Sequence, residues 1–192
     1  MVRSRRINLI QSVYGLLLLG MLSGCPGAGD SASAVLPAIT DAPNICIIPG
    51  ASNQLVDEVV ARINQIRVER GLSALTVNEE LTLAAEDYAC QHIEHNFYEL
   101  LGGRSGEGLS HEHPITGEGP GGRAIQAGYL FVTLGENLAG GQTTAASVVA
   151  DWMDSPGHRD NILDPRWRDM GVGVRTGGHF GVYWVQMFGD PP

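Results

Sequence analysis

The sequence predicts an α+β domain in which long helices come first and an antiparallel hairpin comes last. Apolar residues recur at helical spacing in three segments between residues 54 and 152. Two β-rich runs, 170–175 and 179–188, then flank the turn sequence Thr176-Gly177-Gly178. A Gly-Gly turn between such runs is typical of a hairpin. The sequence shows neither βαβ alternation nor an internal repeat, so a parallel α/β sheet is not expected.

The first two helices are predicted from their caps and apolar stripes. We expect the first over residues 54–70, with Asn53 as its N-cap and Gly71 just after its end. Its stripe consists of Leu55, Val59, Ile63 and Ile66. The second helix should start at Glu79 after the cap residue Asn78, because acidic residues in a first turn suit the helix dipole.

The middle of the chain combines a long loop with a third long helix. Residues 101–122 are rich in glycine and polar residues, which predicts a surface loop, and a short helix is expected over 123–127. Thr143 or Thr144 should cap the third long helix. Ser155-Pro156-Gly157 should end it soon after Trp152.

The N-terminus has the anatomy of an export signal. Arginines near the start precede an apolar run at 13–22, which is shorter than the roughly 20 residues that a membrane helix needs. The run ends in Leu22-Ser23-Gly24-Cys25, which resembles the lipobox of bacterial lipoproteins. We therefore expect a signal peptide over 1–24 and a lipid anchor on Cys25. The alternative is a plain secretory signal, which would leave Cys25 as a free thiol.

A tether should separate this anchor from the folded domain. Residues 25–45 are rich in Gly, Ala, Ser and Pro, so we expect a flexible tether there and the domain over 46–192. Pro26 after the cysteine favours the outer membrane as destination if the cell has two membranes. Because an exported compartment permits oxidation, Cys46 and Cys90 are expected to form a disulfide, and two buried free thiols are the alternative.

Composition excludes several classes of function. A net charge of -9 and a pI near 5.0 give no basic field for nucleic acid, so a nucleic-acid partner is not expected. All 12 basic residues are arginines, which excludes a P-loop lysine and Schiff-base chemistry.

Several short motifs occur in one order along the chain. They are Leu72-Ser73-Ala74-Leu75, Asn78-Glu79-Glu80-Leu81, Ser110-His111-Glu112-His113-Pro114, Ala127-Gly128-Tyr129, Gly135-Glu136-Asn137, Asp151-Trp152-Met153-Asp154-Ser155-Pro156-Gly157-His158-Arg159, Asn161-Ile162-Leu163 and Met170-Gly171-Val172-Gly173-Val174. This ordered set resembles the CAP superfamily of cysteine-rich secretory proteins, antigen 5 and pathogenesis-related 1 proteins, in its bacterial SCP-like branch. The resemblance implies a three-layer α-β-α sandwich with a central antiparallel sheet and a wide cleft.

The same resemblance implies which residues face the cleft. Its two histidines fall on His111 and His158, and its first glutamate falls on Glu136. The second glutamate of many eukaryotic members has no match, and Asp154 is the carboxylate that stands nearest to its place.

Two kinds of chemistry fit these cleft residues. Two neutral imidazoles and a carboxylate could bind a divalent cation such as zinc loosely and leave room for a water. They could instead form a hydrogen-bonded His-Glu-His network without metal. A covalent hydrolase is disfavoured because the chain has no Gly-x-Ser-x-Gly elbow. We expect His92 and His95 to be surface or dipole-facing residues, and His113 to be a solvated loop residue.

Two main functions remain open. The first is an extracytoplasmic ligand-binding module of a bacterial envelope, anchored through Cys25, whose ligand is a lipid, a peptide or a protein. The second is a metal-assisted hydrolase, in which His111 and His158 bind the metal and Glu136 acts as general base. A structural envelope protein with a vestigial cleft is a third alternative. Whether the protein is an enzyme is left open.

Overall fold

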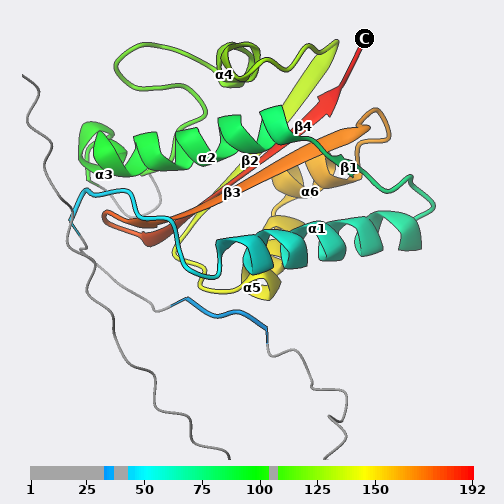
Figure 1. Cartoon of the computed structure of the whole chain (residues 1–192), viewed down its shortest axis with the longest axis horizontal. Helices are drawn as coiled ribbons and strands as arrows, with labels where there is room; N and C mark the ends of the chain where they lie inside the picture. Colours follow the sequence, from blue (N-terminus) through cyan, green and yellow to red (C-terminus); the bar gives the residue numbers. More distant parts are fainter. Residues whose placement is uncertain (1–32, 37–42, 104–107) are drawn as a thin grey trace, which may run out of the picture. The chain divides into compact units, whose positions relative to one another are not determined.

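The computed structural model describes residues 33–36, 43–103 and 108–192; the expected signal peptide and Cys25 lie outside these residues. A four-stranded sheet forms the central layer of the domain, as Figure 1 shows. Helices α1, α5 and α6 cover one face of the sheet, and α2 covers the other. The expected α+β sandwich is therefore present.

The elements alternate between helices and strands more often than the sequence predicts. In chain order they are α1 (Ser52–Glu69), β1 (Thr76–Val77), α2 (Glu79–Glu94), α3 (Phe97–Leu100), α4 (Pro120–Ala127), β2 (Thr133–Gly140), α5 (Ala145–Asp154), α6 (Pro156–Leu163), β3 (Asp169–Gly177) and β4 (Gly181–Asp190).

Two of the three predicted N-caps are confirmed. The Asn78 side chain accepts a hydrogen bond from the Leu81 amide at the start of α2, and Thr144 accepts one from the Ser147 amide at the start of α5. The prediction for α1 was wrong. Ala51 is its cap residue and makes no side-chain cap, so Asn53 lies inside the first turn.

Prolines that begin helices explain two further corrections. Pro156 occupies the first position of α6, where its missing amide hydrogen costs nothing, so the expected terminator of α5 is also the start of another helix. Pro120 likewise begins α4 three residues before the predicted start. Strand β2 was not predicted either, since its sequence TLGENLAG is rich in residues with low strand propensity.

The sheet is antiparallel over its three long strands, as expected, and the short strand β1 makes it mixed. Its strand order is β1-β3-β4-β2, with β2, β4 and β3 antiparallel as neighbours. The short strand β1 pairs with β3 in parallel, through Thr76 with Asp169 and Val77 with Met170. Strand β2 lies at the opposite edge from β1, and this edge carries the site described below.

Alternation along β3 sorts side chains to the two faces. Val172 and Val174 are buried in the apolar cluster that includes α1 and α5. Gly171 and Gly173 face α2, where an added Cβ would lie only 2.2 Å and 2.5 Å from backbone atoms of that helix. Glycine at these two positions therefore lets α2 pack directly on the strand.

The N-terminal part of the domain is tied down at two places. The predicted Cys46–Cys90 disulfide is present and joins the incoming chain to α2. Further upstream, Ala34 and Leu36 are buried, although the sequence placed them in the tether. The Leu36 amide donates to the Thr143 carbonyl at 2.8 Å, so this segment contacts the start of α5. Across the described ranges, no helix has both the length and the apolarity of a membrane span.

Candidate functional site: a histidine cleft at the edge of the sheet

Glu136 is the centre of the candidate site. It lies on the edge strand β2, opposite Met187 of β4, and its side chain is 1% exposed. One carboxylate oxygen, Oε1, accepts from His111 Nδ1 at 2.8 Å. The other, Oε2, accepts from the Arg123 guanidinium at 2.7 Å. Both oxygens of this buried carboxylate are therefore engaged.

Arg123 of α4 supplies the balancing charge, although no pattern in the sequence predicts this role. Its side chain is 3% exposed and packs over the Tyr88 ring, with Cζ 3.3 Å from the ring centroid. The guanidinium also donates to the carbonyl oxygens of Glu118 and His111. A single arginine in a short glycine-rich helix leaves no periodicity from which these contacts could be inferred.

Two residues of α2 hold the segment that bears His111. The Tyr88 hydroxyl donates to the Ser110 carbonyl at 2.6 Å, and the Ser110 amide donates to His92 Nε2 at 3.3 Å. The peptide groups next to His111 are thus fixed, while the His111 side chain itself is 54% exposed. The imidazole is therefore held through Nδ1 by Glu136, and the rest of the ring is open to solvent.

His92 is buried, so the expectation of a surface histidine was wrong. It is 1% exposed because it lies one helical turn after Tyr88 on the inner face of α2. Nδ1 donates to the Tyr88 carbonyl and Nε2 accepts from Ser110, which requires the neutral imidazole. Burial, the largest cause, and the nearby charge of Arg123 lower the pKa of His92 to about 4.

This histidine makes stability depend on acidity. The pKa is 6.5 for an unperturbed histidine and about 4 in the fold, so the neutral form is favoured by folding. Its contribution is complete above about pH 6.5 and is lost as the pH falls toward 4, a loss of about 3 kcal/mol. Denaturant unfolding at pH 7, 5.5 and 4 should show it. In His92→Leu this share of the pH dependence should vanish, and an unchanged pH dependence would contradict the assignment.

His158 approaches the same strand edge from α6. Its carbonyl accepts from Asn137 Nδ2 at 3.2 Å, and Asn161 donates to the Glu136 carbonyl at 3.0 Å. Asparagine side chains thus join α6 to the edge of β2. Burial, followed by the nearby charge of His111, lowers the pKa of His158, which keeps this imidazole neutral at physiological pH.

The remaining predicted residues have other surroundings. Asp154 is exposed at the end of α5, and its side chain has no hydrogen bond or ion pair with any described residue. His113 is 6% exposed and stacks edge-on against Phe97, so the expectation of a solvated loop histidine was wrong. The structure brings together His111, Glu136 and His158, and adds Arg123 to them.

Comparison with known proteins agrees with the fold and with this site. The model of the cysteine-rich secretory protein family, CAP, matches residues 60–188, which include every residue of the cleft named above. The chain belongs to the CAP family. It is also 30% identical over 162 residues to the uncharacterized protein YkwD of Bacillus subtilis, which covers 84% of this chain and 57% of that protein. The chain thus spans a little over half the length of this curated relative.

Solved structures show the same CAP fold at low identity. An extracellular SCP-domain protein of Bacillus anthracis aligns with a TM-score of 0.59 at 23% identity, over 72% of this chain and 41% of that one. An outer surface protein of Borrelia burgdorferi aligns with a TM-score of 0.60 at 20% identity, over 71% of this chain and 92% of that one. These likenesses concern the fold of the domain.

The CAP cleft of this chain offers few donors for a metal ion. Within the residues that the structure describes, no group of three or more His, Cys, Asp or Glu side chains is arranged to hold one. Because Arg123 and His111 take both oxygens of Glu136, His111 and His158 are the donors that remain. An open zinc site uses three protein ligands, so a three-ligand site does not fit this geometry. A cation held loosely by the two imidazoles stays a prediction.

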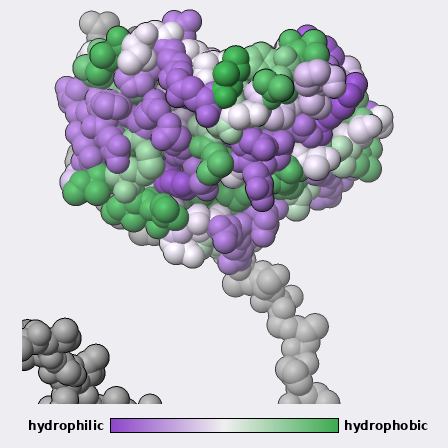
Figure 2. Space-filling view, turned by 45° about the horizontal axis from the view of Figure 1, so that its top comes forward, coloured by the Kyte–Doolittle hydropathy of each residue, from purple (hydrophilic) through white to green (hydrophobic). Residues whose placement is uncertain are grey.

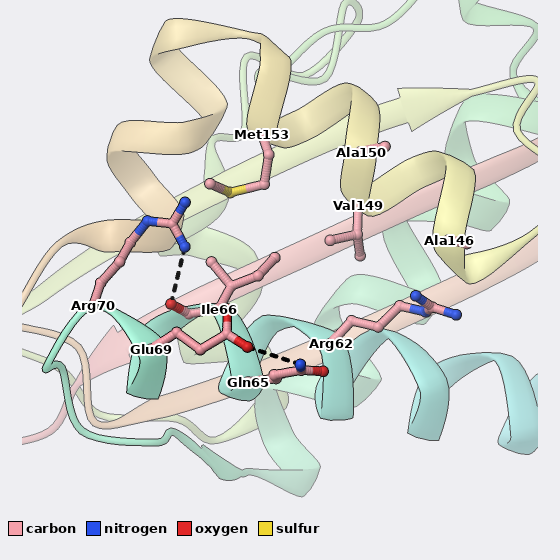
Figure 3. A pocket seen from close by; sticks show the side chains of 9 residues that line it. All are labelled: Arg62, Gln65, Ile66, Glu69, Arg70, Ala146, Val149, Ala150 and Met153. Carbon is pink, nitrogen blue, oxygen red and sulfur yellow. Dashed lines mark hydrogen bonds between the residues drawn. The ribbon is translucent and has the colours of Figure 1, made fainter.

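Two of the cavities on the described part of the CAP domain are lined by residues of α5. One, of about 280 Å³, runs from His158 along the second half of β2 to the hairpin turn at Phe180. The other, of about 390 Å³, lies between α1 and α5. Figure 3 shows the second, where Ile66, Val149 and Met153 form an apolar floor and arginines stand at the rim. The first cavity shares His158 with the histidine cleft, and the second shares no residue with it.

Proposed function

We propose that this CAP domain is an extracytoplasmic ligand-binding module, which binds a lipid, a peptide or a protein at the histidine cleft and does not hydrolyse it. The observation that carries the proposal is the state of Glu136. Its charge is neutralised by the buried Arg123, and its two oxygens are already hydrogen-bonded. A carboxylate held in this way orients His111 and is poorly placed to act as general base on a water.

The two imidazoles suit recognition of polar groups. The Glu136 carboxylate can only accept, so His111 donates through Nδ1 and presents Nε2 to the solvent. The neutral His158 adds a second group that can donate or accept. Figure 2 shows hydrophobic side chains in separate patches among hydrophilic ones, as is ordinary for a water-exposed surface.

A panel of probes tests this function. The full chain is titrated with monomeric lauric acid, with tryptic peptides of casein and with intact casein as a protein. NMR follows the ring signals of His111 and His158. The proposal predicts saturable shifts with at least one class and none in Glu136→Ala. If no class shifts either ring, or if zinc-dependent peptide hydrolysis appears and His111→Ala abolishes it, the proposal is wrong.

The envelope location is part of the same proposal. It rests on the lipobox-like Leu22-Ser23-Gly24-Cys25 and on two CAP relatives described as extracellular and as an outer surface protein. We propose that a lipid on Cys25 anchors the chain in the membrane. If the cell has two membranes, this is the outer one. The anchor would then hold the cleft outside the cytoplasm.

Replacing Cys25 with alanine should release the chain from membranes. A palmitate analogue fed to expressing cells should label the wild type and leave the variant unlabelled, because the lipid is attached through this thiol. Cys46→Ala/Cys90→Ala serves as control and should remain labelled. A Cys25→Ala chain that stays in the membrane fraction would contradict the anchor.

A further inference from the structure

The geometry points to a subsite for a lysine side chain in the cavity beside His158, where the alkyl stem lies against Leu109, Leu138 and Phe180 and the ammonium group meets Asp151. This inference rests on the proposed function and names the class of ligand: a peptide with a lysine at this position.

The walls of the cavity are apolar and firmly held. Leu138 belongs to the edge strand β2. Leu109 comes from the long loop and Phe180 from the hairpin turn, and both also line the cavity. Phe180 is fixed between two glycines, since an added Cβ at Gly140 or Gly108 would lie 2.9 Å or 2.6 Å from its ring. The wall is therefore preformed, and it offers apolar contact to a chain of methylene groups.

The far end of the cavity carries a carboxylate. The Gln142 amide nitrogen donates to Asp151 Oδ2 at 2.8 Å, which holds one side of the carboxylate. Asp151 lies at the surface, and among the described residues its Oδ1 has no hydrogen-bond partner. This oxygen can therefore accept from an ammonium group, which offers three donors.

Size and charge favour a single cationic side chain. The volume of about 280 Å³ is at the lower limit, about 300 Å³, of the range that is usual for whole small molecules. Apart from His158, whose pKa is lowered by burial, no lining residue is basic, whereas Asp151 is acidic. None of the 192 residues is a lysine, so no segment of this sequence can be the occupant. His158 lies at the near end, where it can bond a peptide amide of that molecule.

Matched probes test the subsite on the full chain. Nα-acetyl-lysine-N′-methylamide carries the stem and the ammonium, and Nα-acetyl-norleucine-N′-methylamide carries the stem alone. NMR follows the backbone amides of Leu109 and Phe180 and the side-chain amide of Gln142. We expect the lysine probe to bind about tenfold more tightly than the norleucine probe, as for a charge-assisted hydrogen bond.

Variants separate the subsite from general attraction to an acidic protein. Asp151→Asn should lower the affinity of the lysine probe about fivefold or more and leave norleucine unchanged. Asp154→Asn is the matched control, because Asp151 and Asp154 are both exposed carboxylates of α5 and only Asp151 lines the cavity; the control should change neither affinity.

Three outcomes would overturn the subsite. They are equal affinity for lysine and norleucine probes, equal effects of Asp151→Asn and Asp154→Asn, and binding of n-pentylamine as tightly as the lysine probe, which would deny the peptide source. If casein peptides shift the His111 and His158 rings with no preference for lysine, the subsite fails and the proposed function stands. If no probe class shifts either ring, the proposed function fails too.

Discussion

Replacing Gly171 with alanine should lower the free energy of unfolding by at least about 3 kcal/mol. The added Cβ would lie 2.2 Å from the Leu81 carbonyl carbon and 2.3 Å from the Thr82 amide nitrogen, both in the backbone of α2. A backbone cannot move aside by changing a rotamer, so α2 must shift away from β3 along its length. Chemical denaturation followed by far-UV circular dichroism measures the loss.

A glycine that faces open space gives the matched control. At Gly157, in α6, an added Cβ would meet nothing within 4 Å. Gly157→Ala should therefore leave stability unchanged or raise it by about 0.5–1 kcal/mol, through the better helix propensity of alanine. Equal stability of Gly171→Ala and the wild type would show that α2 does not pack on β3 as described.

Replacing Arg123 with methionine should cost about 3–5 kcal/mol, because it leaves the buried carboxylate of Glu136 without its cation. The change also removes the hydrogen bonds to the carbonyl oxygens of Glu118 and His111. Methionine keeps much of the apolar volume against Tyr88, so the effect reports on charge more than on packing. Denaturant unfolding at neutral pH is the measurement.

A double-mutant cycle isolates the ion pair. In Arg123→Met/Glu136→Gln the buried group is a neutral amide, so the double variant should be more stable than Arg123→Met alone, by about 1 kcal/mol or more. Additive losses from the two single changes would mean that the two side chains do not stabilise each other.

The sequence predicted best where a local rule decides the structure. Asn78 and Thr144 cap their helices because their side chains reach backbone amides in the same turn. Long apolar stripes likewise located α1, α2 and α5. The final hairpin followed from two β-rich runs and their glycine turn.

Prediction from the sequence failed where tertiary contacts override local preference. Strand β2 has weak strand propensity and exists because it pairs with β4 along its whole length. Pro156 indicates the end of a helix in the sequence, yet proline is equally suited to the first position of the next helix.

The residues of the site also fall into those that the sequence predicts and those that it does not. The motifs pointed to His111, Glu136 and His158, and the structure places these residues around one strand edge. Arg123 and His92 act at long range, through contacts with residues 13 and 18 positions away. No spacing rule connects such pairs, so their roles required the fold.

The tautomer of His111 tests the central claim most directly. If Glu136, neutralised by Arg123, holds His111 by its Nδ1–H, then long-range ¹H–¹⁵N NMR of the neutral imidazole should show the proton on Nδ1. In Glu136→Ala the proton should redistribute toward Nε2, with His92 unchanged as an internal control because its Nδ1 donates to the Tyr88 carbonyl. An Nε2–H tautomer of His111 in the wild type, unaltered by Glu136→Ala, would contradict the cleft described here.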